Sequence, residues 1–105
     1  MHAVIRAEVL EAMRRVYDSQ WYILGPEVSK FEQAYSEFNQ VAHTVGVGNG
    51  LEALTLALRA LGIGPGDEVL VPSNTYIATW LAVTHAGATP VPIEPDPATS
   101  NLDPA

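Results

Sequence analysis

The chain has 105 residues, of which 48% are hydrophobic and 16% charged, a composition that suits one small globular domain. Five Lys and Arg against twelve Asp and Glu give a formal charge of −7, which argues against nucleic acid or an anionic membrane as the main partner. The sequence has no cysteine and no run approaching the ~20 apolar residues of a membrane span, so we expect a cytoplasmic protein without a thiolate metal site.

Two amphipathic helices are predicted in the first forty residues. Apolar residues at helical spacing predict a first helix over about residues 5–17. Gly25-Pro26-Glu27 predicts the start of a second, because proline is favoured at the first helical position. Its apolar stripe is expected in the core, and Lys30, the only lysine, is expected to be solvated. The stripe consists of Val28, Phe31, Tyr35 and Phe38.

The segment between these helices, DSQWYILG, combines a polar bend with four large apolar residues. It is either a strap over the protein's own core or a contact with another subunit or a ligand.

The stretch TVGVGNGLEALTLALRAL, residues 44–61, is the strongest functional signal in the chain. It predicts a strand over 41–47, a turn with glycines at 46, 48 and 50, and a helix over 51–61. Glycines let a backbone approach a ligand closely, and the free N–H groups at a helix start suit a phosphate. Glu52 in the first turn of that helix would repel such an anion, so its side chain should point away. Alternatively, the glycines only make a tight turn and the helix end meets water.

Two common phosphate motifs are missing from this stretch. Leu51 stands where G-x-G-x-x-G requires its third glycine, and no Gly-Lys-Ser/Thr of a P-loop occurs. The histidines at positions 2, 43 and 85 have no metal-ligand spacing.

The remaining sequence predicts a strand–helix–strand unit. A tight turn at 64–67 leads to a strand over 68–71, then a helix over about 76–86 capped by Ser73 or Asn74 and ended by Gly87. The last strand, 89–93, carries two alternate prolines and should lie at a sheet edge, before a proline-rich loop. Such connections favour an α/β fold with a parallel sheet, and so few strands suggest part of a larger domain.

Tyr76 follows the carboxyl end of the 68–71 strand, where ligands bind in open α/β sheets. A phosphate on the amides of the glycine turn and a flat ring stacked on Tyr76 would suit a phosphorylated heterocycle such as pyridoxal 5′-phosphate (PLP).

Three segments resemble the DegT/StrS-type sugar aminotransferases, which are PLP enzymes of fold type I. They are WYILGPEVSKFEQAY, VGVGNGLEALTLALRALGIGPGDEVLVPSNTYIATWLAV and GATPVPIEPDPATSNLDP. The form GNGLEAL resembles the members that act as nucleotide-sugar 3-aminotransferases. The resemblance implies an incomplete three-layer fold-type-I large domain, with residues 1–40 as N-terminal helices and interface strap and 41–105 as the first part of the PLP-binding domain. The family topology also leaves the 41–47 strand without a neighbouring strand in this chain.

Carried over by position, the resemblance assigns PLP binding to Asn49, Gly50, Leu51 and Tyr76. It places a second group near the active-site mouth at a dimer interface, namely Trp21, Tyr22 and Ile23. No catalytic residue or metal ligand is implied, because Lys30 does not match the Schiff-base lysine, which should lie beyond residue 105.

The implied function is transfer of an amino group from glutamate or glutamine to a nucleotide-linked, dTDP-type 3-keto-6-deoxy sugar by a homodimer, with the present chain inactive alone. One alternative is a non-catalytic fragment or phosphate-binding module. Another is a PLP-dependent sugar dehydratase of the same family.

Overall fold

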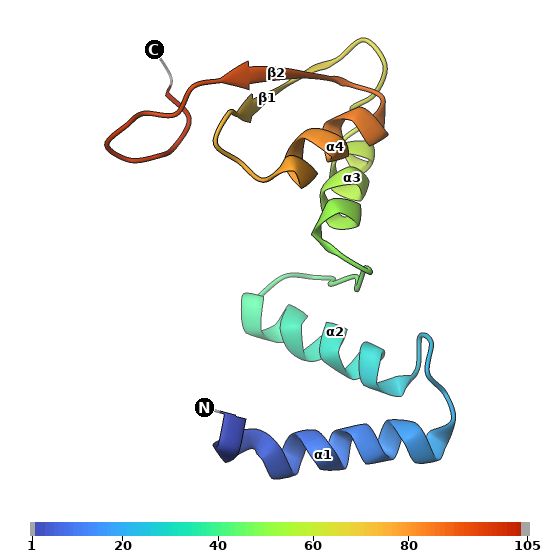
Figure 1. The fold of residues 1–105 in the computed structure, drawn as a ribbon. Coiled ribbons are helices and arrows are strands. Elements are labelled where there is room, and N and C mark those ends of the chain that lie inside the picture. The colour runs from blue at the N-terminus through green and yellow to red at the C-terminus, as the bar shows by residue number, and fades with distance from the viewer. Residues whose placement is uncertain (1, 104–105) are drawn as a thin grey trace. The chain divides into compact units, whose positions relative to one another are not determined.

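The computed structural model describes residues 2–103. The chain divides into two compact units, residues 1–46 and 47–105 (Figure 1). The first contains two helices and the second two helices and two strands, within the described residues. No helix in residues 2–103 is both long and apolar enough to cross a membrane. The predicted division at residues 40 and 41 into domains stays a prediction.

In the first unit, α1 spans His2–Ser19 and α2 spans Pro26–Asn39. The predicted start of α2 is confirmed, since Gly25 is the extended N-cap with Pro26 directly after it. Gln40 ends the helix in the left-handed conformation, with φ 54° and ψ 39°, and its N–H donates to the carbonyl of Glu37. Both helices thus follow from local sequence signals.

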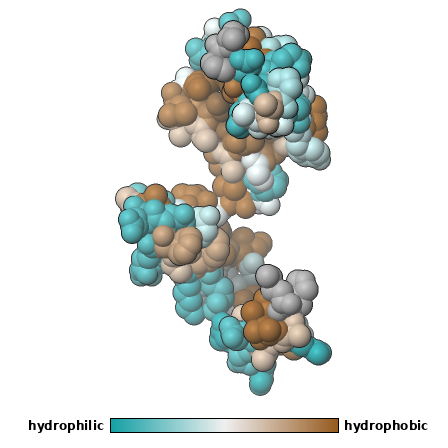
Figure 2. All heavy atoms as spheres, turned by 90° about the vertical axis from the view of Figure 1, so that its left-hand side faces the viewer, coloured by the Kyte–Doolittle hydropathy of each residue, from teal (hydrophilic) through white to brown (hydrophobic). Residues whose placement is uncertain are grey.

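The prediction that the apolar stripe of α2 lies in a core is wrong for this chain. α2 has no buried residue, and Phe31 and Phe38 are 59% and 83% exposed. The rings of Phe31 and Tyr35 stack on each other, with centroids 5.5 Å apart, and not on a second layer. Figure 2 shows hydrophobic residues, in brown, on the surface. The physical reason is that an amphipathic face is buried only where another apolar element covers it.

The predicted strand over residues 41–47 is also wrong, because this segment carries no strand assignment. A strand requires a partner for its ladder of hydrogen bonds. Here two of the backbone N–H groups are used by α2: Val41 donates to the carbonyl of Ser36 over 3.1 Å, and Gly46 donates to the carboxylate of Glu32 over 2.7 Å. The segment is an irregular connection that is hydrogen-bonded to the preceding helix.

The second unit contains α3 (Gly50–Ala60), β1 (Glu68–Pro72), α4 (Ile77–Ala86) and β2 (Thr89–Ile93). Left-handed glycines end both helices as predicted, Gly62 with φ 78° after α3 and Gly87 with φ 91° after α4. The predicted tight turn before β1 is present, with the N–H of Asp67 donating to the carbonyl of Gly64 over 3.1 Å.

The predicted cap of α4 is wrong. The N-cap residue is Tyr76, and it makes no side-chain cap hydrogen bond. Ser73 and Asn74 lie too far upstream, and they bond instead to the loop after β2. The Ser73 hydroxyl donates to Glu94 over 3.0 Å, and the Asn74 amide donates to the carbonyl of Ser100 over 3.4 Å.

β1 and β2 pair in parallel, with Leu70 opposite Val91. α3 and α4 lie side by side, and α4 packs on the sheet (Figure 1). The core of the unit is a cluster of Val71, Val83 and Ala88, against which Leu58 and Trp80 pack. Trp80 is therefore a packing residue of this unit.

The two prolines of β2 fit the geometry of the pair. Thr89 donates its N–H to the carbonyl of Asp67 over 2.9 Å. Alternate residues of a strand direct their N–H groups to the same side, so those of Val91 and Ile93 also face β1. Positions 90 and 92, which lack an N–H, face outward. This arrangement agrees with the predicted edge position of the strand.

Candidate functional site

The start of α3 leaves two backbone amides available to a ligand. The N-cap residue Asn49 is extended, and its side-chain oxygen accepts the N–H of Glu52 over 2.9 Å. The first helical bond runs from the N–H of Ala53 to the carbonyl of Asn49, 3.1 Å long. No group in the described part of the chain accepts a hydrogen bond from the N–H of Gly50 or Leu51. These amides, at the positive end of the helix, can hold an anion.

The side chain of Glu52 lies on a different face of α3 from the face beside Tyr76. Its carboxylate accepts the N–H of Gly48 over 2.9 Å. It lines a groove on another face of the helix, together with Arg59 and His85. The expectation that this negative charge points away from an anion bound beside Tyr76 therefore agrees with the structure.

Tyr76 shares an open groove with the residues of the glycine turn. This groove has a volume of about 750 Å³ and runs between the first turns of α3 and α4. Tyr76 itself is 79% exposed, so its ring is available to a ligand. The groove is lined by Asn49, Gly50, Leu51, Ala53, Leu54, Tyr76, Ile77, Ala78, Thr79 and Leu81. All four residues that the sequence assigns to the cofactor are brought together here.

The two helices run in the same direction. At their far ends, the guanidinium of Arg59 donates to the carbonyl of His85 over 2.7 Å, while their first residues meet at the groove. The positive ends of both helix dipoles therefore lie on one side. None of the described residues that line the groove is a Lys or Arg, so its attraction for an anion comes from backbone amides.

The rest of the groove is apolar, through Leu54, Ile77 and Leu81. Sequence reasoning did not single out these residues, although their helical spacing identifies one apolar face on each helix. Amides at one end and apolar side chains beside them suit a ligand that joins an anionic group to a flat ring.

The other predicted site residues lie in the first unit. Trp21, Tyr22 and Ile23 are 59%, 61% and 79% exposed. The indole N–H of Trp21 donates to the carbonyl of Ile23 over 2.8 Å, so the segment is folded on itself. Their role at an active-site mouth stays a prediction.

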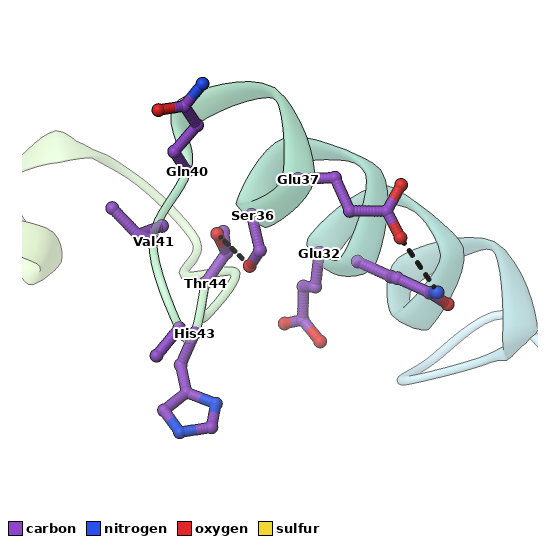
Figure 3. Close-up of a pocket in the computed structure, with 9 residues that line it drawn as sticks. Glu32, Ser36, Glu37, Gln40, Val41, His43 and Thr44 are labelled. Atoms are coloured by element: carbon purple, nitrogen blue, oxygen red, sulfur yellow. Dashed lines mark hydrogen bonds between the residues drawn. The ribbon is translucent and has the colours of Figure 1, made fainter.

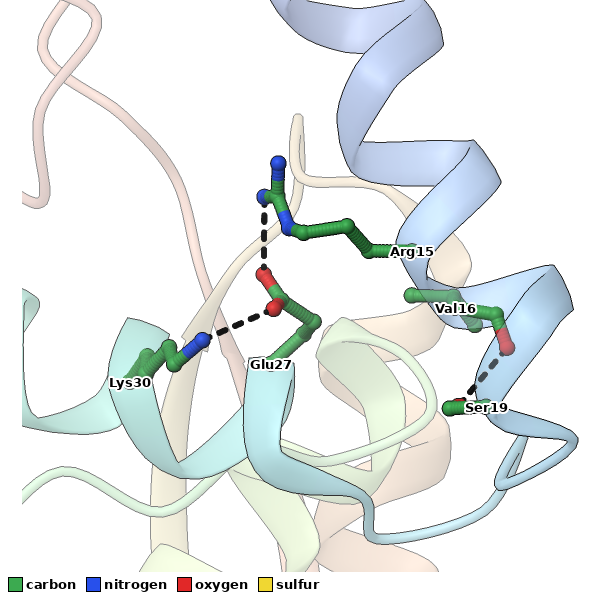
Figure 4. A network of polar contacts seen from close by, with 5 residues as sticks. All are labelled: Arg15, Val16, Ser19, Glu27 and Lys30. Atoms are coloured by element: carbon green, nitrogen blue, oxygen red, sulfur yellow. Dashed lines mark hydrogen bonds and ion pairs between the residues drawn. The ribbon is translucent and has the colours of Figure 1, made fainter.

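Lys30 has a structural partner. Its ammonium group lies 3.0 Å from one carboxylate oxygen of Glu27, and the guanidinium of Arg15 lies 3.5 Å from the other (Figure 4). The hydrogen bond from Lys30, and to a smaller extent the one from Arg15, lowers the pKa of the Glu27 carboxyl group. The Lys30 side chain is 68% exposed, which confirms that it is solvated.

The first unit also contains a hollow of about 440 Å³, which lies between the second half of α2 and residues 41–44. Figure 3 shows the hydroxyls of Ser36 and Thr44 pointing toward one another, 2.7 Å apart, with the imidazole of His43 directed away from them. No group of three or more His, Cys, Asp or Glu in residues 2–103 could hold a metal ion.

Comparison with known proteins identifies relatives along almost the whole chain. Residues 3–105 match the model of the DegT/DnrJ/EryC1/StrS aminotransferase family. The dTDP-3-amino-3,4,6-trideoxy-alpha-D-glucose transaminase of Streptomyces venezuelae is 57% identical over 100 residues, which are 95% of this chain and 26% of the relative.

Two solved structures have a similar fold. The crystal structure of S. venezuelae DesV in complex with a ketimine intermediate superposes with a TM-score of 0.91 at 55% identity, covering 98% of this chain and 28% of that one. NtdA from Bacillus subtilis with bound cofactor PMP gives 0.87 at 31% identity, covering 93% and 22%.

The chain thus spans about a quarter of the length of these relatives. The predicted fold class, α/β and part of a fold-type-I aminotransferase large domain, is confirmed. With this match over residues 3–105, the chain belongs to the DegT/DnrJ/EryC1/StrS aminotransferase family.

Proposed function

We propose that this chain supplies the phosphate-binding turn and the ring-stacking residue of a PLP-dependent sugar aminotransferase. The observation that carries the proposal is the groove in which the two unpaired amides of α3 meet the exposed ring of Tyr76. These features fit PLP, because a phosphate requires hydrogen-bond donors and a pyridine ring requires a flat apolar surface.

In this proposal each residue has a separate task. The N–H groups of Gly50 and Leu51 hold the phosphate, and Asn49 fixes them by capping the helix. Nothing lies within 4 Å of a Cβ added at Gly50, so this position is open to a ligand. The ring of Tyr76 covers one face of the pyridine. When bound, PLP supplies an electron sink for the carbon that exchanges its amino group.

The proposed substrate is a dTDP-linked 3-keto-6-deoxy sugar, with glutamate or glutamine as amino donor. The support is the name of the S. venezuelae relative, a dTDP-3-amino-sugar transaminase, at 57% identity. The groove offers no side chain that selects a sugar, since its polar groups lie at the helix ends.

We also propose that the 105 residues alone do not catalyse transamination. The reaction needs an amine that binds PLP and moves the proton at the amino-bearing carbon. The chain has one lysine, Lys30, and its ammonium group is held by Glu27.

A homodimer is the proposed state of the full-length protein. The support is the family resemblance, which places the exposed residues Trp21, Tyr22 and Ile23 near an active-site mouth at a dimer interface. Light scattering coupled to size-exclusion chromatography measures this state, and a monomer at micromolar concentration contradicts it.

The activity is tested with the full-length protein, PLP, glutamate and a dTDP-linked 3-keto-6-deoxy sugar, by following the amino sugar and 2-oxoglutarate. Formation of both supports the proposal. Loss of water from the sugar without amino transfer identifies the dehydratase alternative. PLP binding without turnover on any keto sugar favours the binding module. Turnover by the 105-residue chain contradicts its proposed inactivity.

A further inference from the structure

We propose that Glu52 is a positioning residue of the phosphate-binding turn. By accepting the N–H of Gly48, its carboxylate fixes the turn that presents the amides of Gly50 and Leu51 to the phosphate. The inference rests on the proposed function, because it concerns the same groove. It goes beyond that function in assigning a task to a side chain that would not touch the cofactor.

The contacts at the turn form a reciprocal pair. The side chain of Asn49 accepts the N–H of Glu52, and the side chain of Glu52 accepts the N–H of Gly48, each over 2.9 Å. The pair resembles a capping box, except that the acidic side chain accepts the N–H of the residue before the N-cap and not that of the N-cap itself. Of the backbone amides at positions 48 to 52, those of Gly48 and Glu52 are thereby satisfied by the turn itself, and those of Asn49, Gly50 and Leu51 have no acceptor in the described residues.

Gly48 is required for this approach. A Cβ added at Gly48 would lie 2.9 Å from one carboxylate oxygen of Glu52 and 3.5 Å from the other. The clash involves the end of a flexible side chain and no backbone atom, so alanine at position 48 would displace the carboxylate without forcing the backbone to move. A substitution at either Gly48 or Glu52 can therefore break the hydrogen bond between them.

The negative charge of Glu52 lies on a face of α3 where its repulsion of an anion bound beside Tyr76 is small. The carboxylate lies in the groove with Arg59 and His85 and is absent from the one that Tyr76 lines. It retains the favourable interaction of an acid with the first turn of a helix. Without its bond to Gly48, the side chain would be free to turn, and its charge could approach the phosphate.

The test compares variants of the full-length protein by their affinity for PLP and for pyridoxal, which lacks the phosphate. Glu52→Ala and Gly48→Ala each break the contact, and Glu52→Gln keeps an oxygen that can accept the N–H of Gly48. Glu8→Ala is the matched control, because it removes the same charge from an exposed position of α1. The ³¹P NMR resonance of the bound phosphate reports directly on its surroundings.

We expect Glu52→Ala and Gly48→Ala to weaken PLP binding by about fivefold, the effect of losing one side-chain bond at a helix start. Pyridoxal binding should be unchanged, and the ³¹P resonance should move. The double variant should lose little more than either single variant, since both remove one contact. Glu52→Gln and Glu8→Ala should bind PLP as the wild type does.

Two results overturn the inference while leaving the proposed function intact. One is PLP affinity and a ³¹P resonance unchanged in both Glu52→Ala and Gly48→Ala. The other is an equal loss of PLP and pyridoxal affinity with a lowered Tm, which marks a purely structural role. A wild-type protein that binds no PLP overturns the proposed function and this inference with it.

Discussion

Gly50 offers a test of the amide site in which one N–H group is removed and little else changes. It is the first residue of α3, the preceding Asn49 is extended with ψ 172°, and a Cβ added at Gly50 meets nothing within 4 Å. Proline is favoured at the first helical position and requires an extended residue before it. The fold should therefore accept Gly50→Pro.

The magnitude follows from the hydrogen bonds at this position. The N–H of Gly50 has no acceptor within residues 2–103, so proline costs the helix no bond. Fewer unfolded conformations should raise the free energy of unfolding by about 0.4–1 kcal/mol. A hydrogen bond to a charged group contributes about 1.5–3 kcal/mol, so PLP should bind roughly 10- to 150-fold more weakly.

The assay is a titration of the PLP-free full-length protein, followed by absorbance, with thermal unfolding measured in parallel. Gly50→Ala is the control, because it introduces a Cβ and keeps the N–H. The difference between the alanine and proline variants then reports the N–H alone. Equal PLP affinity of the two variants, with both folded, would refute the assignment of the phosphate to this amide.

Three further predictions concern the ring, the helix ends and the C-terminal loop. Tyr76→Phe should bind PLP within about twofold of wild type, whereas Tyr76→Ala should lose about 0.5–1.5 kcal/mol of stacking in the same titration. Gly87→Ala should destabilise the full-length protein by about 1–2 kcal/mol in chemical denaturation, because φ is 91°. It should cost more than Gly62→Ala, since an added Cβ meets a proline ring at 3.2 Å at position 87 and nothing at position 62. Backbone N–H bonds from Thr99 and the residue before it lower the pKa of Asp96, so its carboxylate stabilises the loop above its ordinary pKa and loses this effect as the pH falls through the lowered one. The Thr99 amide should therefore lose its protection against exchange at low pH in the wild type, and should lack it at every pH in Asp96→Ala, which has no side-chain oxygen to accept the bond. Equal protection in both proteins at neutral pH would contradict this.

Most of the local structure could be predicted from the sequence. Gly25-Pro26 starts α2, and the left-handed glycines at 62 and 87 end α3 and α4. These signals act within a few residues, because they depend on the φ angles that glycine and proline allow. The turn at 46–50 and Tyr76 stand out in the sequence because each follows a recognisable pattern, and their assignment to a cofactor stays a prediction.

Local sequence signals thus specify which segments become helices and which turns end them. Burial and strand pairing, in contrast, arise only when the elements pack together. Residues 41–47 have the composition of a strand, yet their N–H groups at 41 and 46 bond to α2. The stripe of Phe31 and Phe38 is amphipathic, yet exposed. Burial and strand pairing depend on partners distant in sequence, whereas caps and turns do not. For the same reason, only the packing of α3 on α4 brings Tyr76 beside the two open amides.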